Sequence, residues 1–282
     1  MQWETVLYDR VDDDIVKITL NRPERLNAQD ARLLRELDEA VVTADRDDSV
    51  KVVILTGAGR GFSAGHDMKG LNPGVFDIIT STPEERREFE NVYFFEYCLR
   101  IRNVRKPVIA QVHGACVAAG WMVASMCDII VASDDAYFAN PVLRMAAAGV
   151  ELLTEPYDVG FRKAKEMLWT GDRISAEEAL RWGAINKVVP REALEEETLN
   201  LARRICLTPS YTIRLSKATF NYAQDLQGWR AAQEHHHEVH LMGHLTKEAA
   251  DFFKSVGRSD GMTNPNLKEF LGKRDAGYVK DK

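Results

Sequence analysis

The chain has 282 residues, and its 37 lysines and arginines against 43 aspartates and glutamates give a formal net charge of −6. This acidic balance disfavours a nucleic-acid-binding protein that relies on a broad basic surface. The hydrophobic content of 45% is ordinary for a globular protein and excludes an intrinsically disordered chain. The length allows one large α/β domain, or one domain with a smaller appendage.

The sequence carries no feature of a secreted or membrane protein. Its four cysteines form no CxxC pair, so we expect reduced thiols rather than a disulfide framework. The N-terminal residues contain no basic segment followed by an apolar run, and no stretch approaches the roughly 18 apolar residues of a membrane span. We therefore expect a cytoplasmic protein with no membrane association.

Strand-like and helix-like segments alternate over the first two thirds of the chain. Short β-branched runs predict strands at Ile15–Leu20, Val50–Thr56, Pro107–Val112 and Asp128–Ala132. Helical spacing of apolar residues predicts helices at Ala31–Ala44 and Glu84–Val104. This alternation predicts a mainly parallel sheet with helices packed against it.

The last third of the chain is predicted to be almost entirely helical. Ser175 and Glu178 form a capping box at the start of this part. After the short run Ala184–Val189, helices are predicted at Glu192–Leu207, Ser210–Ala223, Trp229–His244 and Thr246–Val256. We therefore divide the chain into an α/β domain, residues 1–199, and a helical appendage, residues 200–282, which we expect to dock on a neighbouring subunit.

Two segments that follow predicted strands are candidates for chemistry. The first, Thr56–Asp67, has four glycines in nine residues, but it matches the G-x-G-x-x-G dinucleotide fingerprint poorly because no helical pattern starts inside it. The second, Gly114–Met126, predicts a buried helix of small residues whose first N–H groups can stabilise a developing negative charge. Alone, the first could be a surface loop and the second a core helix. Together they predict one N–H from each segment converging on a single oxygen.

The ordered motifs of the chain resemble those of the crotonase superfamily, the enoyl-CoA hydratase/isomerase family. The resemblance runs from about Thr5 to Met262, nearly the whole chain. It is carried by Asn21–Ala28 (NRPERLNA), Val52–Gly57 (VVILTG), Phe62–Met68 (FSAGHDM), Gly114–Asp128, Phe138–Pro141 (FANP) and Leu168–Ala176 (LWTGDRISA).

The resemblance implies an α/β fold, a crotonase-like spiral of ββα turns in residues 1–199, with an α-helical trimerisation region in residues 200–282. It implies a homo-oligomer, a trimer or a dimer of trimers, that acts on an acyl-CoA thioester. Coenzyme A would enter only as part of the substrate, with no separate cofactor and no metal. The thioester oxygen would lie between the backbone N–H groups of His66 and Ala119. The CoA arm would run past Arg25, Leu26, Ala28, Ala64, Met68 and Lys69.

The chain departs from the family at both glutamates that hydratases use. Alignment of the motifs places Met122 and Val142 at those positions, and neither side chain can transfer a proton or hold water by a charge-assisted bond. Standard hydration is therefore in doubt. Isomerisation, decarboxylation, thioester hydrolysis and mere binding of CoA thioesters stay open, whereas the acidic segment Glu36–Asp48 disfavours the RNA-binding relatives of this superfamily. An apolar Met122 and Val142 would suit a hydrophobic acyl group.

Glu151 is the best candidate for a replacement acid or base. Other family members place a catalytic aspartate or tyrosine about eight or nine positions after the second glutamate, which here falls at Val150 or Glu151. Alternatively, Glu151 starts a helix or pairs with Arg144. His66 is the other ionisable candidate: decarboxylases of methylmalonyl-CoA type with this Ala-Gly-His-Asp loop use the histidine, but their tyrosine near Ala148–Gly149 is absent.

Five of the seven histidines lie in His235–His244. His236, His240 and His244 repeat every four residues and could share one helical face. A catalytic zinc site requires a third protein ligand, and the H-E-x-x-H motif is absent. We interpret the segment as a surface or subunit-interface helix rather than a metal site.

Overall fold

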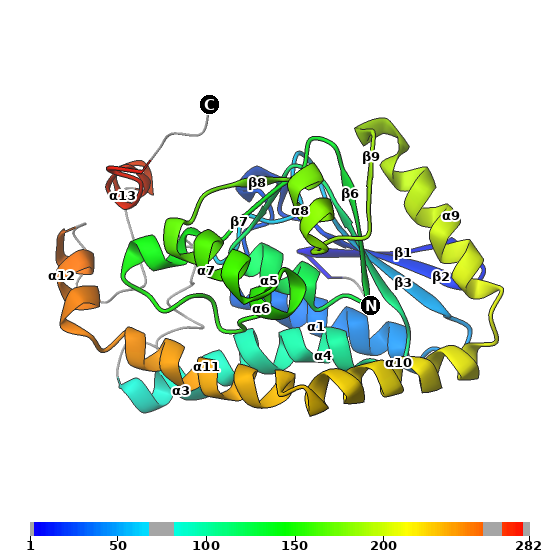
Figure 1. Ribbon diagram of the computed structural model, residues 1–282. Coiled ribbons are helices and arrows are strands. Elements are labelled where there is room, and N and C mark those ends of the chain that lie inside the picture. The colour runs from blue at the N-terminus through cyan, green and yellow to red at the C-terminus, as the bar shows by residue number, and fades with distance from the viewer. Residues whose placement is uncertain (1–2, 68–81, 256–266, 279–282) are drawn as a thin grey trace.

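The fold is built on a six-stranded sheet with a second, smaller sheet beside it. The computed structural model describes residues 3–67, 82–255 and 267–278 (Figure 1). Along the large sheet the strands lie in the order β1 (Val6–Asp12), β2 (Ile15–Leu20), β3 (Val52–Gly57), β4 (Val108–Val112), β6 (Ile129–Ser133) and β9 (Lys187–Val189). Only the β1–β2 pair of this sheet is antiparallel. The small sheet has the order β5 (Ala115–Val117), β7 (Tyr137–Ala139) and β8 (Ile174–Ser175).

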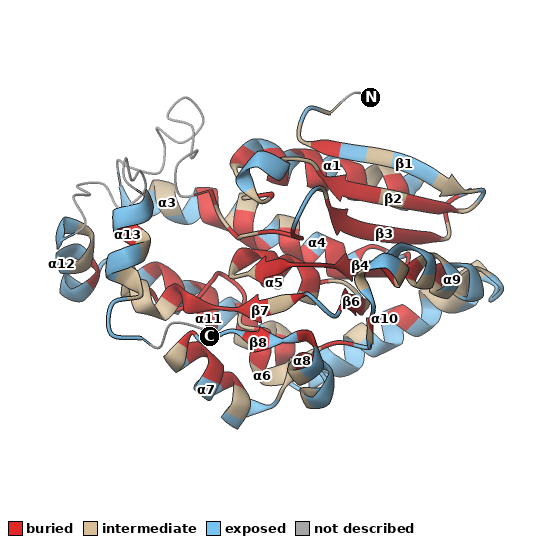
Figure 2. Ribbon diagram, turned by 90° about the horizontal axis from the view of Figure 1, so that it is seen from above, coloured by how far each residue is buried: buried red, intermediate tan, exposed pale blue. Residues whose placement is uncertain are grey.

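The central strands are apolar along their whole length because helices cover both faces of the sheet. Every residue of β3 and β4 is buried, and Figure 2 shows these strands inside the molecule. On one face they pack against α1 (Ala31–Arg46) and α4 (Tyr97–Asn103), and on the other against α9 (Leu194–Cys206). Strands buried on both faces are typical of parallel sheets. The predicted parallel core is confirmed.

The helices follow the sequence pattern closely. Asp30 begins α1 by accepting a hydrogen bond from the backbone N–H of Leu33 at 2.9 Å, and the capping box of Ser175 and Glu178 begins α8. The predicted helix Glu84–Val104 consists of α3 (Pro83–Glu90), a π-helical segment and α4. The remaining helices are α5 (Ala119–Ser125), α6 (Glu155–Asp158), α7 (Phe161–Thr170), α8 (Ala176–Trp182), α10 (Ser210–Leu226), α11 (Trp229–Gly243), α12 (Lys247–Ser255) and α13 (Leu267–Arg274). Short 3₁₀ helices span Pro23–Arg25, Pro141–Met145 and Arg191–Ala193.

The structure adds one element to the predicted small-residue helix. Residues Ala115–Val117 form the strand β5, and the helix α5 begins only at Ala119. A strand of three residues is too short to show the alternation that identifies strands in a sequence. The division of the chain at residue 199, inside α9, stays a prediction. No helix within the described ranges combines the length and the apolar character needed to cross a membrane.

Candidate active site

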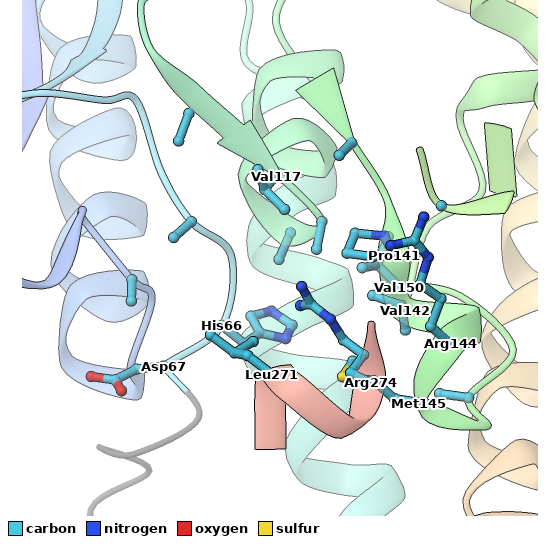
Figure 3. Close-up of a pocket in the computed structure, with 18 of the residues that line it drawn as sticks. His66, Asp67, Val117, Pro141, Val142, Arg144, Met145, Val150, Leu271 and Arg274 are labelled. Atoms are coloured by element: carbon cyan, nitrogen blue, oxygen red, sulfur yellow. The ribbon is translucent and has the colours of Figure 1, made fainter. Parts of the chain in front are cut away.

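A cavity of about 620 Å³ lies where the glycine-rich loop, the start of α5, the segment after β7 and the helices α11 and α13 meet (Figure 3). Residues predicted for the site that line it are Arg25, Leu26, Ala28, Ala64, His66, Ala119, Val142 and Glu151. Met122 is buried in the main hydrophobic core and is not part of this lining. Met68 and Lys69 lie outside the described residues. The structure therefore gathers most of the predicted site around one cavity.

The two predicted loops are joined directly to each other. The backbone N–H of Ser63 donates to the carbonyl oxygen of Ala115, and that of Val117 donates to the carbonyl oxygen of Ser63, both at 3.0 Å. Gly65 has φ +92°, and a Cβ atom there would lie 2.9 Å from the Val117 oxygen and 3.3 Å from the Ala119 nitrogen. Only glycine permits so close an approach in that conformation. The His66 loop and the first turn of α5 are thus held side by side.

At this junction, two backbone N–H donors make no hydrogen bond to any described residue. Ala119 is the first residue of α5, so its N–H has no partner within the helix. Among the described residues, no hydrogen bond uses the backbone N–H of His66 or of Ala119. The Gln29 Nε2 donates a hydrogen bond to the carbonyl oxygen of Ala119 at 3.1 Å, which holds the first residue of α5 in place. Both His66 and Ala119 line the cavity, where their donors can meet a ligand oxygen.

The neighbouring Asp67 anchors the loop. Figure 3 shows its side chain pointing away from His66. Its Oδ2 atom accepts a hydrogen bond from Arg22 Nη2 at 2.8 Å, and only 4% of the Asp67 side chain is exposed. A buried carboxylate held by a guanidinium has a structural role.

His66 and Glu151 meet inside the cavity. The His66 ring stacks on Phe94 with 4.0 Å between the ring centroids, and its Nδ1 atom lies 3.7 Å from Glu151 Oε1. Burial lowers the pKa of His66, which favours the neutral ring. Both alternatives for Glu151 are wrong: residue 151 lies in no helix, and Arg144 pairs instead with acidic residues near α13 and α7. Glu151 is a buried carboxyl group on the cavity wall.

The interpretation of the histidine run as a surface or subunit-interface helix is wrong for its inner face. His236, His237 and His240 are buried within the chain. The His236 Nε2 donates to the carbonyl oxygen of Val150 at 2.8 Å, so α11 packs directly on the segment that carries Glu151. The four-residue repeat that we read from the sequence marks the face of α11 that packs inward, because side chains four apart share one side of a helix.

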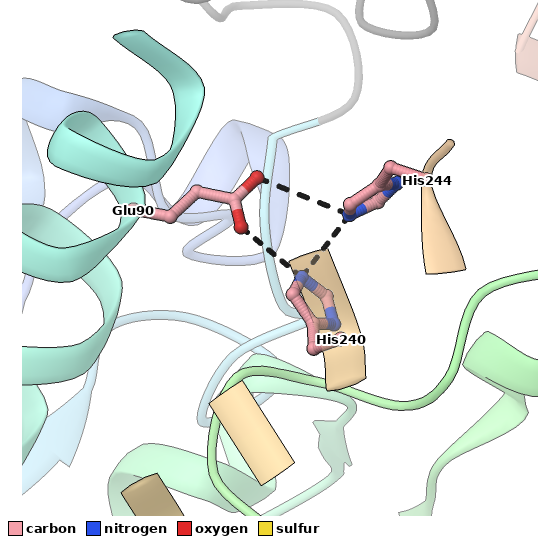
Figure 4. A group of neighbouring side chains, drawn as sticks. All are labelled: Glu90, His240 and His244. Carbon is pink, nitrogen blue, oxygen red and sulfur yellow. Dashed lines mark hydrogen bonds and ion pairs between the residues drawn. The ribbon is translucent and has the colours of Figure 1, made fainter. Parts of the chain in front are cut away.

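Among the lining residues that sequence reasoning missed is the carboxylate Glu90. Its side chain is 3% exposed, and its Oε2 atom lies 3.2 Å from His240 Nε2. Burial by itself raises the pKa of such a carboxyl group, but the adjacent His240 and His244 lower the pKa of Glu90 below its ordinary value. Glu90, His240 and His244 each present one atom able to bind a metal, and these atoms lie within 4.8 Å of one another (Figure 4). In the sequence, Glu90 is one of several charged residues of α3 and has no distinguishing feature.

Comparison with known proteins shows the family of the chain. Residues 10–259 match the enoyl-CoA hydratase/isomerase family. The chain belongs to that family. The Mycobacterium tuberculosis protein named "Putative enoyl-CoA hydratase EchA13" is 40% identical over 263 residues, covering 86% of this chain and 81% of that protein.

Solved structures of the family have the same fold. A probable enoyl-CoA hydratase from Mycobacterium smegmatis is 40% identical, with a TM-score of 0.81 over 92% of this chain and 99% of that chain. An enoyl-CoA hydratase/isomerase from Xanthobacter autotrophicus Py2 is 31% identical, with a TM-score of 0.88 over 99% of this chain and 100% of that chain. The predicted crotonase-like α/β fold with a helical C-terminal region is confirmed.

Proposed function

We propose that the chain is an acyl-CoA thioester enzyme that stabilises a thioester enolate between the backbone N–H groups of His66 and Ala119. The observation that carries the proposal is the junction of the two loops at Gly65, which brings to one cavity two donors that make no hydrogen bond within the described part of the chain. One such donor typically stabilises a transition state by about 2.7–4 kcal/mol. The CoA arm is assigned to Arg25, Leu26, Ala28 and Ala64, which line the cavity, and the resemblance also implies Met68 and Lys69, which lie outside the described residues.

Glu151 is proposed to move the proton at the carbon next to the thioester carbonyl. Its Oε1 atom contacts His66, and its Oε2 atom has no hydrogen-bond partner among the described residues. Val142 on the cavity wall and Met122 in the core leave no carboxylate at the two hydratase positions. These positions support enolate chemistry in which Glu151 is the acid or base. The alternatives to hydration are isomerisation, decarboxylation and thioester hydrolysis, or binding of a CoA thioester without catalysis.

We also propose that the protein is a cytoplasmic homo-oligomer, either a trimer or a dimer of trimers. Helix α10 buries only Lys217 of its seventeen residues in the single chain, and it exposes large apolar side chains. Its exposed apolar residues are Tyr211, Leu215, Phe220, Tyr222 and Leu226. Several large apolar side chains exposed on one helix support a protein–protein interface there.

The proposal is tested by incubating the protein with enoyl-, hydroxyacyl- and malonyl-type CoA thioesters in D₂O and following the products by mass spectrometry. We expect deuterium to enter at the α-carbon of at least one thioester, and the products of the panel identify the net reaction. A protein that binds a thioester tightly but exchanges none would be a binding protein.

The variant Glu151→Gln is expected to slow this exchange by about 100-fold or more, the typical contribution of an acid or base, while thioester binding is retained. The matched control is Glu155→Gln. Glu155 is also buried and accepts a hydrogen bond from Asn140 at 2.8 Å, but it does not line the cavity. Exchange at the wild-type rate in the Glu151 variant would remove Glu151 from the mechanism.

A further inference from the structure

Three side chains from two distant parts of the chain converge at one end of the cavity. Glu90 is the last residue of α3, His240 lies on the inner face of α11, and His244 follows the end of that helix. Figure 4 shows the carboxylate facing both imidazole rings. The Nε2 atoms of the two histidines lie 3.1 Å apart. Glu90 Oε2 lies 3.2 Å from His240 Nε2, and the other oxygen, Oε1, lies 3.9 Å from His244 Nε2, so the two carboxylate oxygens face one histidine each.

These separations fit a shared metal ion. Nitrogen and oxygen ligands bind Zn²⁺ at about 2.0–2.2 Å, so two ligands at a tetrahedral angle are separated by about 3.4 Å. Two histidines and one carboxylate are a ligand set found in mononuclear metal sites. The two ring planes meet at 87° with 4.7 Å between their centroids, so the rings are not stacked on each other.

The ring of His240 is held in the tautomer that a metal requires. Its Nδ1 atom lies 2.8 Å from the carbonyl oxygen of Gly149. Because a carbonyl oxygen only accepts hydrogen bonds, Nδ1 carries a proton. This leaves Nε2, which faces Glu90 and His244, as the atom of the ring that would bind a metal ion, with the ion taking the place of any proton there. A backbone carbonyl behind a metal-binding histidine is the usual arrangement, since it fixes both the tautomer and the orientation of the ring.

The backbone around Glu90 supplies a second, independent observation. The π-helical segment Asn91–Glu96 begins at the residue after Glu90. Such segments are rare and occur frequently at functional sites. The nearby Glu151 adds another buried carboxyl group, with its Oε1 atom 3.5 Å from His240 Nε2. Two buried carboxyl groups around one imidazole nitrogen favour a positive charge at this place, either a proton on His240 or a bound metal ion, and the test below distinguishes the two.

We propose that Glu90, His240 and His244 bind a divalent transition-metal ion, with Zn²⁺ as the reference ion, at the wall of the cavity. All three residues line the cavity, so three protein ligands leave a coordination position facing it, as in catalytic rather than structural zinc sites. A water molecule bound there would stand on the side of the cavity that carries Glu151. A catalytic role of this bound water rests on the proposed function. The binding of the ion itself does not.

The test uses the full chain without an affinity tag, stripped of metal by a chelator and dialysed. The protein is equilibrated with ZnCl₂, freed of excess ion by gel filtration and analysed by elemental mass spectrometry. In parallel, CoCl₂ is added and the visible absorption of the bound ion is recorded. We expect one ion per chain and a cobalt spectrum of low coordination number.

The ligand variants are Glu90→Gln, which preserves the shape of the side chain, and His244→Ala, which removes the most exposed of the three ligands. Even the loss of an outer partner lowers metal affinity by about 10–100-fold, so we expect a loss of at least about 100-fold in both variants. The matched control is His235→Ala, because His235 is exposed on the same helix and outside the cluster. It is expected to bind the ion as the wild type does, and far-ultraviolet circular dichroism confirms that each variant is folded.

Two results would overturn the proposal. Wild-type protein that holds no ion at equilibrium would mean that a proton on His240, rather than a metal, holds the two carboxyl groups together. Ion binding that survives in both ligand variants, or that disappears in the His235 control, would place the ligands elsewhere in the histidine run. None of these measurements involves a thioester, so failure of the enolate mechanism and failure of the metal site are distinguished.

Discussion

The substitution Gly65→Ala tests the junction on which the proposed enolate site depends. Gly65 has φ +92°, and an added Cβ atom would lie 2.9 Å from the Val117 oxygen, 3.2 Å from Ala118 Cβ and 3.3 Å from the Ala119 nitrogen. The first distance is shorter than a Cβ contact tolerates, and its partner is backbone rather than a flexible side chain. The start of α5 must therefore move away from the His66 loop.

The expected magnitudes follow from this geometry. A left-handed conformation at a residue other than glycine costs about 1–3 kcal/mol. For 282 residues the entropy of unfolding is about 0.6 kcal/mol/K, so this strain alone lowers the thermal midpoint by about 2–5 °C. Displacing the Ala119 N–H removes one of the two donors, which typically lowers the rate by about 100- to 1000-fold.

The control is Gly160→Ala. Gly160 has φ +78° with no atom within 4 Å of an added Cβ, so this variant has the same kind of backbone strain without the close contact. We measure thermal unfolding and deuterium exchange into a bound acyl-CoA for both variants. Both should lose stability, but only Gly65→Ala should lose exchange. Equal exchange rates in the two variants would refute the assignment of the donors.

Two further predictions concern residues behind the site. Asn27→Ala removes a fully buried amide that donates to the carbonyl oxygens of Ala58 and Gly61 at 2.9 Å, so we expect a loss of about 1–3 kcal/mol in urea unfolding for each carbonyl left unpaired. Burial, together with the adjacent Glu155, raises the pKa of Asp158 to about 7. At pH values between 3.8, the ordinary pKa of an aspartate, and about 7, the folded chain keeps a proton on Asp158 that the unfolded chain releases. The free energy of unfolding therefore falls as the pH rises through this range. Asp158→Asn should therefore stabilise the protein more at about pH 8.5 than at about pH 5.5, by on the order of 1–2 kcal/mol in urea unfolding, and an equal effect at both pH values would contradict the raised pKa.

Local patterns in the sequence were sufficient for most of the framework. The strand predicted at Ile15–Leu20 has those bounds in the structure, and the capping box at Ser175 begins α8 as expected. The two loops that follow buried strands were also identified. These features are encoded by residues within a few positions of one another, since periodicity and caps depend on neighbours along the chain.

The tertiary structure decided which polar residues share the cavity. The sequence pointed to Glu151 and to the regular spacing of the histidines, but it could not show that α11 turns His240 toward Glu151 and Glu90. Glu90 itself carries no signal in the charged helix α3, and Met122 turned out to lie in the core. The physical reason is that a contact between α3 and α11 depends on how both helices pack on the rest of the fold. The acidic composition thus excluded a broad basic surface, while only the folded chain showed how acidic residues are used at one buried site.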